Sequence, residues 1–427
     1  MKRRLSEIGW VVGGQAMTAL GTIVGVRVLT QILAPAAYGT VSLALGMSTL
    51  AVSLVAAPPT QAAIHLYPQV TAQGSARELL DSVLRYYRRT APWALGVALL
   101  AAIAYVLSGQ GTPILVLVLT LLFASDCWRS ANLSLLNAAR RQGRYALWSA
   151  GDSWSRPLAA TLTALIFGQS ALAVLSAYMV VAVLLAVVFS RGLWPSDSTL
   201  TASEMEARSR RWDPRVWSYA LPLLPLGVVN WASGMGDRYI IGATLGMADA
   251  GVYAALYGLS SMPFILLYTM TEQGLRPIYQ TAVSRGDRAQ AQRILMLWFA
   301  LVVVVCGAGV LVYTFGHEWI ASLVVGKAYR HASGLMPWIA LGYAIRSCSN
   351  VFERVPYAYG KPKRVLIILV CSVGATAVLT PLGIFAFGIQ GAAMAVPLYF
   401  SIQLATAVLL ARRTIRESDA AGVPTFA

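Results

Sequence analysis

The sequence predicts an all-α integral membrane protein with about twelve transmembrane helices in two pseudo-symmetric six-helix bundles around a central cavity. Of its 427 residues, 57% are hydrophobic and only 12% are charged, and its mean hydropathy is +0.64. A soluble domain carries about 25% charged residues. Apolar runs of about 18 or more residues recur along the whole chain, and each is long enough to cross a hydrocarbon core of roughly 30 Å as a helix.

The first predicted span follows a short basic segment that contains Lys2, Arg3 and Arg4. This segment resembles the start of a signal peptide, but the apolar stretch after it is too long and lacks a small-residue cleavage site, so we interpret it as an uncleaved span. The predicted spans cover residues 8–33, 38–58, 91–108, 112–137, 144–168, 171–192, 215–234, 247–271, 292–315, 335–356, 364–386 and 389–411.

The distribution of basic residues supports twelve spans with both termini in the cytoplasm, because cytoplasmic loops retain Lys and Arg. On this topology 25 of the 33 basic residues fall in internal segments, and the external loops hold only Arg238, Lys327 and Arg330. The alternation runs without a break from the first loop to the last. A wrong number of spans would interrupt it.

The net charge of +16 does not indicate a nucleic-acid partner, because the basic residues lie in short clusters between apolar runs and not on one face of a folded domain. The cysteines fall inside predicted spans and have no disulfide or metal-binding spacing, and the three histidines are scattered. We therefore predict no cofactor and no metal. These residues are Cys127, Cys306, Cys348 and Cys371, with His65, His317 and His331.

The predicted organisation is an N-terminal bundle at 1–192, a cytoplasmic linker at 193–214, a C-terminal bundle at 215–412 and a cytoplasmic tail at 413–427. No external loop exceeds about 20 residues, so none could form a catalytic domain. Residues 76–90 alternate apolar and charged side chains, which predicts a short amphipathic helix at the inner membrane interface. A simple polar loop is the alternative.

Two pairs of segments echo each other at an offset of about half the chain. RVLTQILAPAAYGTVSLALGMS begins at Arg27 and RYIIGATLGMADAGVYAALYGLS begins at Arg238, with Gly39 and Gly251 at matching places. Arg129-Ser130 and Arg346-Ser347 each precede a glycine by 14 residues. Two echoes at nearly one offset predict parallel repeats of six spans, with a substrate site between them near the midplane. Pro222 and Pro225 would kink the seventh span. The kink could serve a rocking of one half against the other during transport, or it could serve packing alone.

Several charged residues lie inside predicted spans, where they cost at least roughly 2.5–3.5 kcal/mol and therefore face a cavity or a partner. Asp126 and Arg129 share a helix face, as do Asp152 and Arg156. Polar stripes on the first, fourth and tenth spans indicate that these helices line one water-filled cavity. The intramembrane charges are Arg27, Arg129, Arg156, Arg346, Arg354, Asp126, Asp152 and Glu353.

We predict a cationic substrate site formed by Arg129 and Arg346 first, with Arg27 and Arg156, and no catalytic residues. Arginine excess suits an anionic substrate, because guanidinium groups bind phosphate oxygens through forked hydrogen bonds. Arg27 and Arg354 could instead reach the membrane interface, and Asp152 with Arg156 could be a neutral structural pair. Asp126, Asp152 and Glu353 are candidates for coupling to Na⁺ or H⁺, between which the sequence does not choose.

The chain resembles the polysaccharide transporter (Wzx-like) family of the multidrug/oligosaccharidyl-lipid/polysaccharide (MOP) flippase superfamily. The resemblance rests on RVLTQILAPAAYG, DRYIIGATLGMADAGVYAALYGLS, LVVGKAYRHASGLMPWIALG and YGKPKRVL, and it covers the whole length. It implies alternating access around a cationic cavity in the bacterial inner membrane. The implied substrate is an undecaprenyl-pyrophosphate-linked oligosaccharide for O-antigen, capsule or exopolysaccharide synthesis, with membrane lipids and polysaccharide polymerase machinery as implied partners.

Two other functions remain open. A multidrug or small-molecule antiporter of the same superfamily would have the same architecture, but a net basic interior counts against it. A membrane polysaccharide polymerase or ligase would need a sizeable outer loop with catalytic groups. The longest predicted outer loop has only His317, Glu318, Lys327, Arg330 and His331, with no paired carboxylates or Ser/His/Asp set.

Overall fold

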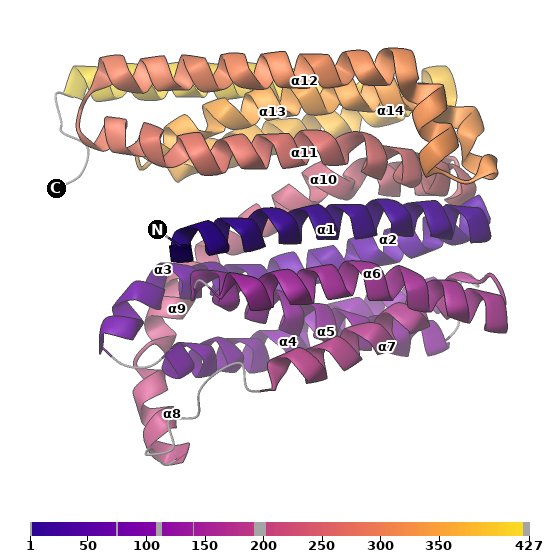
Figure 1. The fold of residues 1–427 in the computed structure, drawn as a ribbon, viewed down its shortest axis with the longest axis horizontal. Helices are drawn as coiled ribbons and strands as arrows, with labels where there is room; N and C mark the ends of the chain where they lie inside the picture. The colour runs from indigo at the N-terminus through magenta and orange to yellow at the C-terminus, as the bar shows by residue number, and fades with distance from the viewer. Residues whose placement is uncertain (1, 74–75, 108–112, 140, 192–201, 422–427) are drawn as a thin grey trace. The chain divides into compact units, whose positions relative to one another are not determined.

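Within the described residues, the twelve predicted spans fall on helical backbone apart from Leu33, Gly168 and Arg191, and span residues 108, 112 and 192 lie outside the described residues. The structure is a computed structural model and describes residues 2–73, 76–107, 113–139, 141–191 and 202–421, among which no strand occurs. The all-α prediction is confirmed (Figure 1). By length and composition, six helical stretches within the described residues qualify to cross a membrane: 35–67, 113–138, 171–190, 247–284, 288–324 and 362–418.

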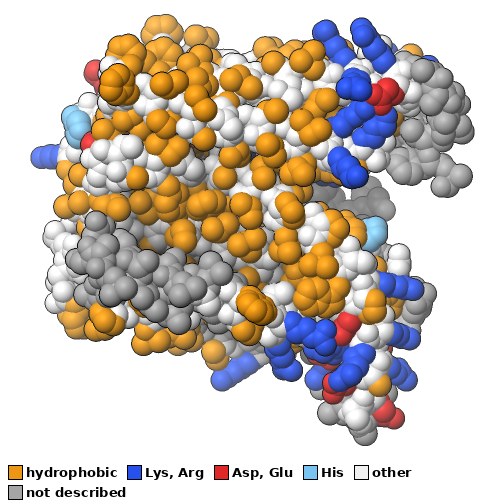
Figure 2. All heavy atoms as spheres, turned by 180° about the vertical axis from the view of Figure 1, so that it is seen from behind, with side chains coloured by type: hydrophobic (Ala, Val, Ile, Leu, Met, Phe, Trp, Pro, Cys, Tyr) orange, Lys and Arg blue, Asp and Glu red, His pale blue; other side chains and the backbone are white. Residues whose placement is uncertain are grey.

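The chain divides into two compact units, which are Met1–Leu33 with Thr40–Trp231, and Ala34–Gly39 with Ala232–Ala427. In each unit, apolar side chains cover most of the face drawn in Figure 2, and most Lys and Arg side chains gather at one end. This distribution is typical of a membrane-spanning bundle, in which lipid covers the apolar sides. The first nine α-helices are α1 (Lys2–Ile32), α2 (Pro35–Ala51), α3 (Ala57–Gln73), α4 (Ala76–Leu107), α5 (Pro113–Ala138), α6 (Gln142–Phe167), α7 (Ala171–Ser190), α8 (Ala202–Arg210) and α9 (Asp213–Ala220).

The second predicted span is longer than the sequence indicated. A π-helical turn at Val52–Ala56 joins α2 to α3, so helical backbone continues to Gln73 although hydropathy placed the end at residue 58. A π-turn inserts one residue into the helical ladder without ending it. Pro58 and Pro59 follow directly after this π-turn, and because neither has a backbone N–H, each removes one backbone hydrogen bond at the junction.

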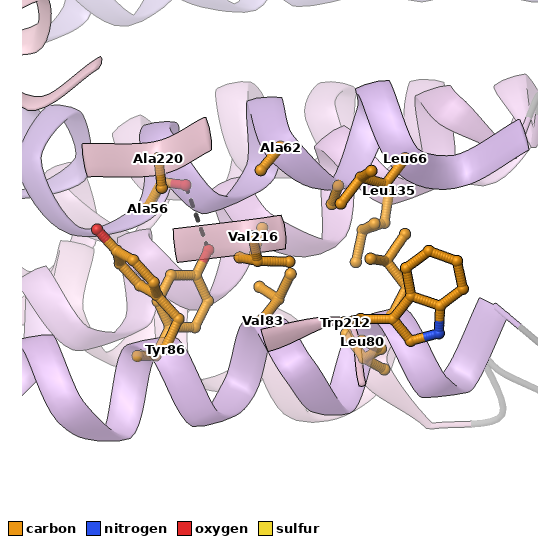
Figure 3. Packing of buried hydrophobic residues seen from close by; sticks show 14 of the residues in the cluster. Ala56, Ala62, Leu66, Leu80, Val83, Tyr86, Leu135, Trp212, Val216 and Ala220 are labelled. Carbon is orange, nitrogen blue, oxygen red and sulfur yellow. Dashed lines mark hydrogen bonds between the residues drawn. The ribbon is translucent and has the colours of Figure 1, made fainter. Parts of the chain in front are cut away.

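The predicted amphipathic helix at 76–90 and the third span form one continuous helix, α4. We predicted that the apolar face of residues 76–90 lies on the inner membrane interface, but in the structure this face packs against other helices of the protein. Leu79 and Val83 are fully buried in a cluster with residues of α3, α5 and α9 (Figure 3). Hydropathy alone cannot separate the two outcomes, because protein and lipid offer an apolar face similar environments. The labelled members of this cluster are Ala56, Ala62, Leu66, Leu80, Val83, Tyr86, Leu135, Trp212, Val216 and Ala220.

Ion pairs fix α9 against α4 at the edge of this cluster. Arg85 donates from Nε and Nη2 to the two carboxylate oxygens of Asp213, at 3.0 and 2.8 Å, and Ser82 donates to the same carboxylate at 2.7 Å. Burial alone would raise the pKa of Asp213, but the hydrogen bonds from Arg85 and Ser82 outweigh it and lower that pKa. The indole of Trp212 donates to Glu78 at 3.2 Å. The end of the predicted linker is therefore packed on the first unit.

The second unit contains the end of α10 (Leu224–Thr244), which follows a short 3-10 turn at Leu221–Leu223, and four further helices. These are α11 (Met247–Ser284), α12 (Arg288–Val324), α13 (Met336–Ala358) and α14 (Pro362–Ala421), with a 3-10 segment at Lys327–Leu335. The backbone of α14 breaks at Phe387 and Gly388, where Gly388 has a φ of 59°, so α14 contains the last two predicted spans.

The seventh span also extends further than predicted. Hydropathy ended it at residue 234 and placed Arg238 in an external loop, whereas α10 continues to Thr244 and Arg238 is 8% exposed. The prediction for Arg238 is therefore wrong. Asp237 and Arg238 lower the local hydropathy, but their charges are compensated inside the protein and the helix does not end there.

Two glycines that match in the echoed segments pack against each other in the second unit. A Cβ at Gly39 would overlap the carbonyl oxygen of Met247, and a Cβ at Gly251 would overlap the carbonyl oxygen of Pro35. The first turn of α2 and the first turn of α11 thus approach backbone to backbone. Small residues at such crossings are the usual means of close helix packing in membranes.

We expect Gly251→Ala to lower the free energy of unfolding by about 1–3 kcal/mol, the usual cost of overpacking a close contact. Thermal unfolding of the purified protein in detergent measures this change. The matched control is Gly258→Ala, two turns along the same helix, where an added Cβ would have no neighbour within 4 Å. Equal midpoints for the two variants would contradict the close contact.

Candidate functional site

Four predicted site residues form one cluster in the first unit. Asp126 and Arg129 come from α5, and Asp152 and Arg156 come from α6. Because Asp152 and Arg156 are four residues apart, they share a helix face, and Arg156 Nε donates to Asp152 at 2.7 Å. Its Nη2 reaches across to Asp126 at 2.5 Å. One guanidinium thus joins the two helices through both carboxylates.

The cluster is electrically balanced, with two carboxylates and two guanidinium groups. Ser48 of α2 donates to Asp126 at 2.8 Å, and the ring centroid of Tyr178 in α7 lies 5.8 Å from the Arg156 guanidinium carbon. Arg156 is only 8% exposed and is held by both acids. This geometry is that of the neutral structural pair that the spacing left open, extended by Asp126 and Arg129 to four residues.

Arg129 is held less tightly than Arg156. Its nearest contacts with Asp126 and Asp152 are both 3.6 Å, its side chain is 28% exposed, and its buried Nε has no hydrogen-bond partner. Such longer contacts satisfy its charge but not all of its donors. Within the first-unit cluster, Arg129 is therefore the member with donors left for another ligand.

Arg346 in α13 has a different environment from Arg129, although the two residues match in the predicted repeat. Its guanidinium carbon lies 5.0 Å from the ring centroid of Phe400 and 5.6 Å from that of Tyr343. No carboxylate of the described residues lies within ion-pair distance of it. Aromatic faces stabilise a cation electrostatically without using its N–H donors.

Glu353 lies two turns further along α13 and is 6% exposed. Its carboxylate accepts hydrogen bonds from Gln403 Nε2 at 2.7 Å and from Ser349 at 3.3 Å. Gln403 in turn accepts from Ser372 at 2.8 Å. Neutral donors thus surround this buried acid, whereas arginines engage Asp126 and Asp152 directly.

Sequence reasoning missed a second charged group in the same unit, at Asp237 and Arg238. Asp237 accepts from the Tyr253 hydroxyl at 2.8 Å and from the Tyr399 hydroxyl at 3.5 Å, and Arg238 lies 4.4 Å from the ring centroid of Tyr257. Adjacent opposite charges directly after a long apolar run were the available signal. We placed them in a loop because they ended the hydropathy window.

The remaining two intramembrane arginines, Arg27 and Arg354, both lie near polar partners. Arg354 Nε lies 2.9 Å from Glu272 and 3.0 Å from the hydroxyl of Tyr268, so it is tied to α11. Arg27 is partly exposed, and the side-chain amide of Gln31, one turn on, lies 3.2 and 3.1 Å from its Nε and Nη2, so that the amide oxygen accepts from both when the amide is turned toward them. Thr18 and Thr22 of the predicted polar stripe donate to their own helix backbone.

Comparison with known proteins shows which solved structures this fold is similar to. Residues 227–382 match the family model MatE. The structure is similar to that of the lipid II flippase MurJ in an inward closed conformation, with a TM-score of 0.68 and 12% identity over 95% of this chain and 87% of that one. A comparison with curated protein sequences found no match.

Two MATE structures are similar as well. An outward-facing MATE family transporter of the MOP superfamily gives a TM-score of 0.58 and 11% identity over 97% of this chain and 94% of that one. MATE in a straight conformation gives a TM-score of 0.56 and 12% identity over 95% of this chain and 94% of that one. The chain therefore has a MATE- and MurJ-like transporter fold.

We expect Arg156→Met to destabilise the protein by roughly 3–5 kcal/mol, because it leaves two buried carboxylates without their shared cation. Thermal unfolding in detergent measures the loss. Arg210→Met is the control, since Arg210 pairs with Glu206 at an exposed i,i+4 position and such pairs contribute little. A midpoint for Arg156→Met as high as that of the control would contradict a structural role for the cluster.

Proposed function

We propose that the chain is a flippase that moves an undecaprenyl-pyrophosphate-linked oligosaccharide across the bacterial inner membrane for cell-surface polysaccharide synthesis. The similarity of the fold to that of the lipid II flippase MurJ supports a flippase as the class of transporter. The charge of the candidate site supports an anionic, phosphate-containing substrate. Alternating access, coupled to an ion gradient, is the motion this architecture supports.

The observation that carries the proposal is the environment of Arg346. A guanidinium inside an apolar helix is costly, and the cluster around Arg156 illustrates the ordinary solution, which is direct pairing with carboxylates. Arg346 is instead stabilised by the faces of Tyr343 and Phe400. Its planar set of donors stays available, and this set matches the oxygens of a phosphate or pyrophosphate.

Arg129 is the second candidate contact, because its ion pairs are long and one of its donors is unsatisfied. Arg156 is better assigned to structure than to substrate. Among the acids, Glu353 is the strongest candidate for ion coupling, since neutral partners allow it to take up a proton or a cation without breaking an ion pair.

A multidrug or small-molecule antiporter is the second candidate, and the match of residues 227–382 to MatE favours it equally. Organic cations bind to aromatic faces and carboxylates, and Tyr253, Tyr257 and Asp237 cluster in the second unit. Against this function, the positive charge of the adjacent Arg238 acts on Asp237, and its guanidinium covers the ring of Tyr257. A polymerase or ligase has no support from a transporter fold.

We expect Arg346→Gln to reduce export of the lipid-linked oligosaccharide by about tenfold to a hundredfold, since a hydrogen bond to a charged group contributes roughly 1.5–3 kcal/mol. Export is measured in cells that depend on the chain, as surface polymer formed and lipid-linked intermediate retained inside, at equal protein abundance. Arg346→Lys keeps the positive charge but loses the forked pair of N–H donors, so its export should lie between that of wild type and that of Arg346→Gln.

Arg285→Gln, at an exposed position after α11, is the control. Normal polymer output from Arg346→Gln would remove this residue from the substrate site. Unchanged export together with altered resistance to cationic drugs would favour the antiporter instead.

We expect Glu353→Gln to abolish the response of transport to an imposed gradient of H⁺ or Na⁺, because the amide keeps the size of the side chain but cannot titrate or neutralise a cation. Reconstituted vesicles with each gradient in turn measure this response. Glu318→Gln, exposed near the end of α12, should behave as wild type. A gradient response that survives in Glu353→Gln would assign coupling to another group.

A further inference from the structure

The two ends of α14 meet at a cluster of basic side chains in the second unit. Lys361 and Arg364 donate to Oε2 of Glu417 at 2.7 and 2.5 Å, and Arg413 donates to Oε1 at 2.9 Å. These three cations lower the pKa of Glu417 to about 2, so the carboxylate stays ionised at neutral pH. One acid is thus shared by three bases, and the cluster keeps a positive charge.

Two further arginines in this cluster are not committed to any acid. Arg412 and Arg416 are exposed, lie one turn apart on α14, and form no ion pair with the described part of the chain. Together with Leu409, Arg413 and Glu417 they line a cavity of about 410 Å³. Their N–H donors therefore face an open space large enough for a phosphate group.

The same face of α14 carries an exposed apolar stripe that leads to this cavity. Leu398, Ile402 and Leu409 are 56%, 43% and 66% exposed, and their spacing of four and seven residues keeps them on one side of the helix. Arg412 and Arg416 follow on that side at the end of the stripe. Apolar side chains along the helix and arginines at its end match an acyl chain and the headgroup above it.

We propose that this surface, formed by Leu398, Ile402, Leu409, Arg412 and Arg416, binds an anionic phospholipid. The two arginines bind the headgroup phosphate, and an acyl chain lies along the apolar stripe. Basic residues at the end of a membrane helix attract anionic lipids through the general field, whereas the cavity and the stripe together select one bound lipid. This site does not depend on the proposed transport function.

Native mass spectrometry of the purified full chain, mixed with phosphatidylglycerol and phosphatidylcholine, tests the proposal. Wild type should retain phosphatidylglycerol in preference to phosphatidylcholine. The double variant Arg412→Gln/Arg416→Gln should retain about tenfold less, because each of two contacts at exposed, solvent-screened positions contributes only a few-fold. Thermal unfolding without lipid verifies that this variant is folded.

The matched control is Arg285→Gln/Arg293→Gln, which removes the same charge at exposed positions beside the junction of α11 and α12. It should retain phosphatidylglycerol as wild type does. Equal losses in the two double variants would overturn the proposal, because anionic lipid would then be attracted only by the general positive charge at the helix ends.

Leu409→Ser separates a lipid from a free anion, because it alters the stripe and leaves every charge in place. It should lower phosphatidylglycerol retention, and millimolar inorganic phosphate should not displace the lipid from wild type. Full retention by Leu409→Ser, or displacement by inorganic phosphate, would identify a phosphate site and refute the lipid site.

Discussion

The cost of placing charge inside an apolar helical bundle determines how the interior of this protein is built. Each guanidinium within a span must recover the hydration that it loses. In the first unit Arg156 does so through two carboxylates, with contacts of 2.5 and 2.7 Å. That solution leaves a neutral, hydrogen-bonded cluster that joins α5 to α6. It stabilises the bundle and uses up most of the groups that could have bound a ligand.

The second unit solves the same problem in another way, which leaves donors available. Aromatic faces of Tyr343 and Phe400 stabilise Arg346, and the ring of Tyr257 stabilises Arg238 beside Asp237. A π-face interacts with the charge but occupies none of the N–H groups. The positive charge of Arg346 is thus retained at lower cost without being neutralised, which is the property that a phosphate-binding transporter needs and a structural ion pair removes.

The sequence predicts the helices well because apolar length and basic loops depend on local composition alone. It predicts partners poorly because they depend on tertiary contact. Asp152 and Arg156 share a face by spacing, but the contact of Arg156 with Asp126 and the hydrogen bond from Ser48 cross between helices. Arg238 was misplaced because a hydropathy window does not show the ring of Tyr257, which its guanidinium contacts, or the effect of the neighbouring charge of Asp237. The face of α4 was misplaced because α9, distant in sequence, covers it.

The echo of Gly39 and Gly251 has a direct physical cause. Each glycine packs on the carbonyl oxygen four residues before the other, Met247 for Gly39 and Pro35 for Gly251. The contact is therefore symmetrical: the same two positions of each segment face the same two positions of its counterpart. A side chain on either glycine would separate both helix turns, so the two positions share one constraint. Symmetrical contact of this kind is what a pair of related helices produces around a local two-fold axis. Packing at one shared contact thus explains why both positions are glycine, whereas the repeat of six spans stays a prediction.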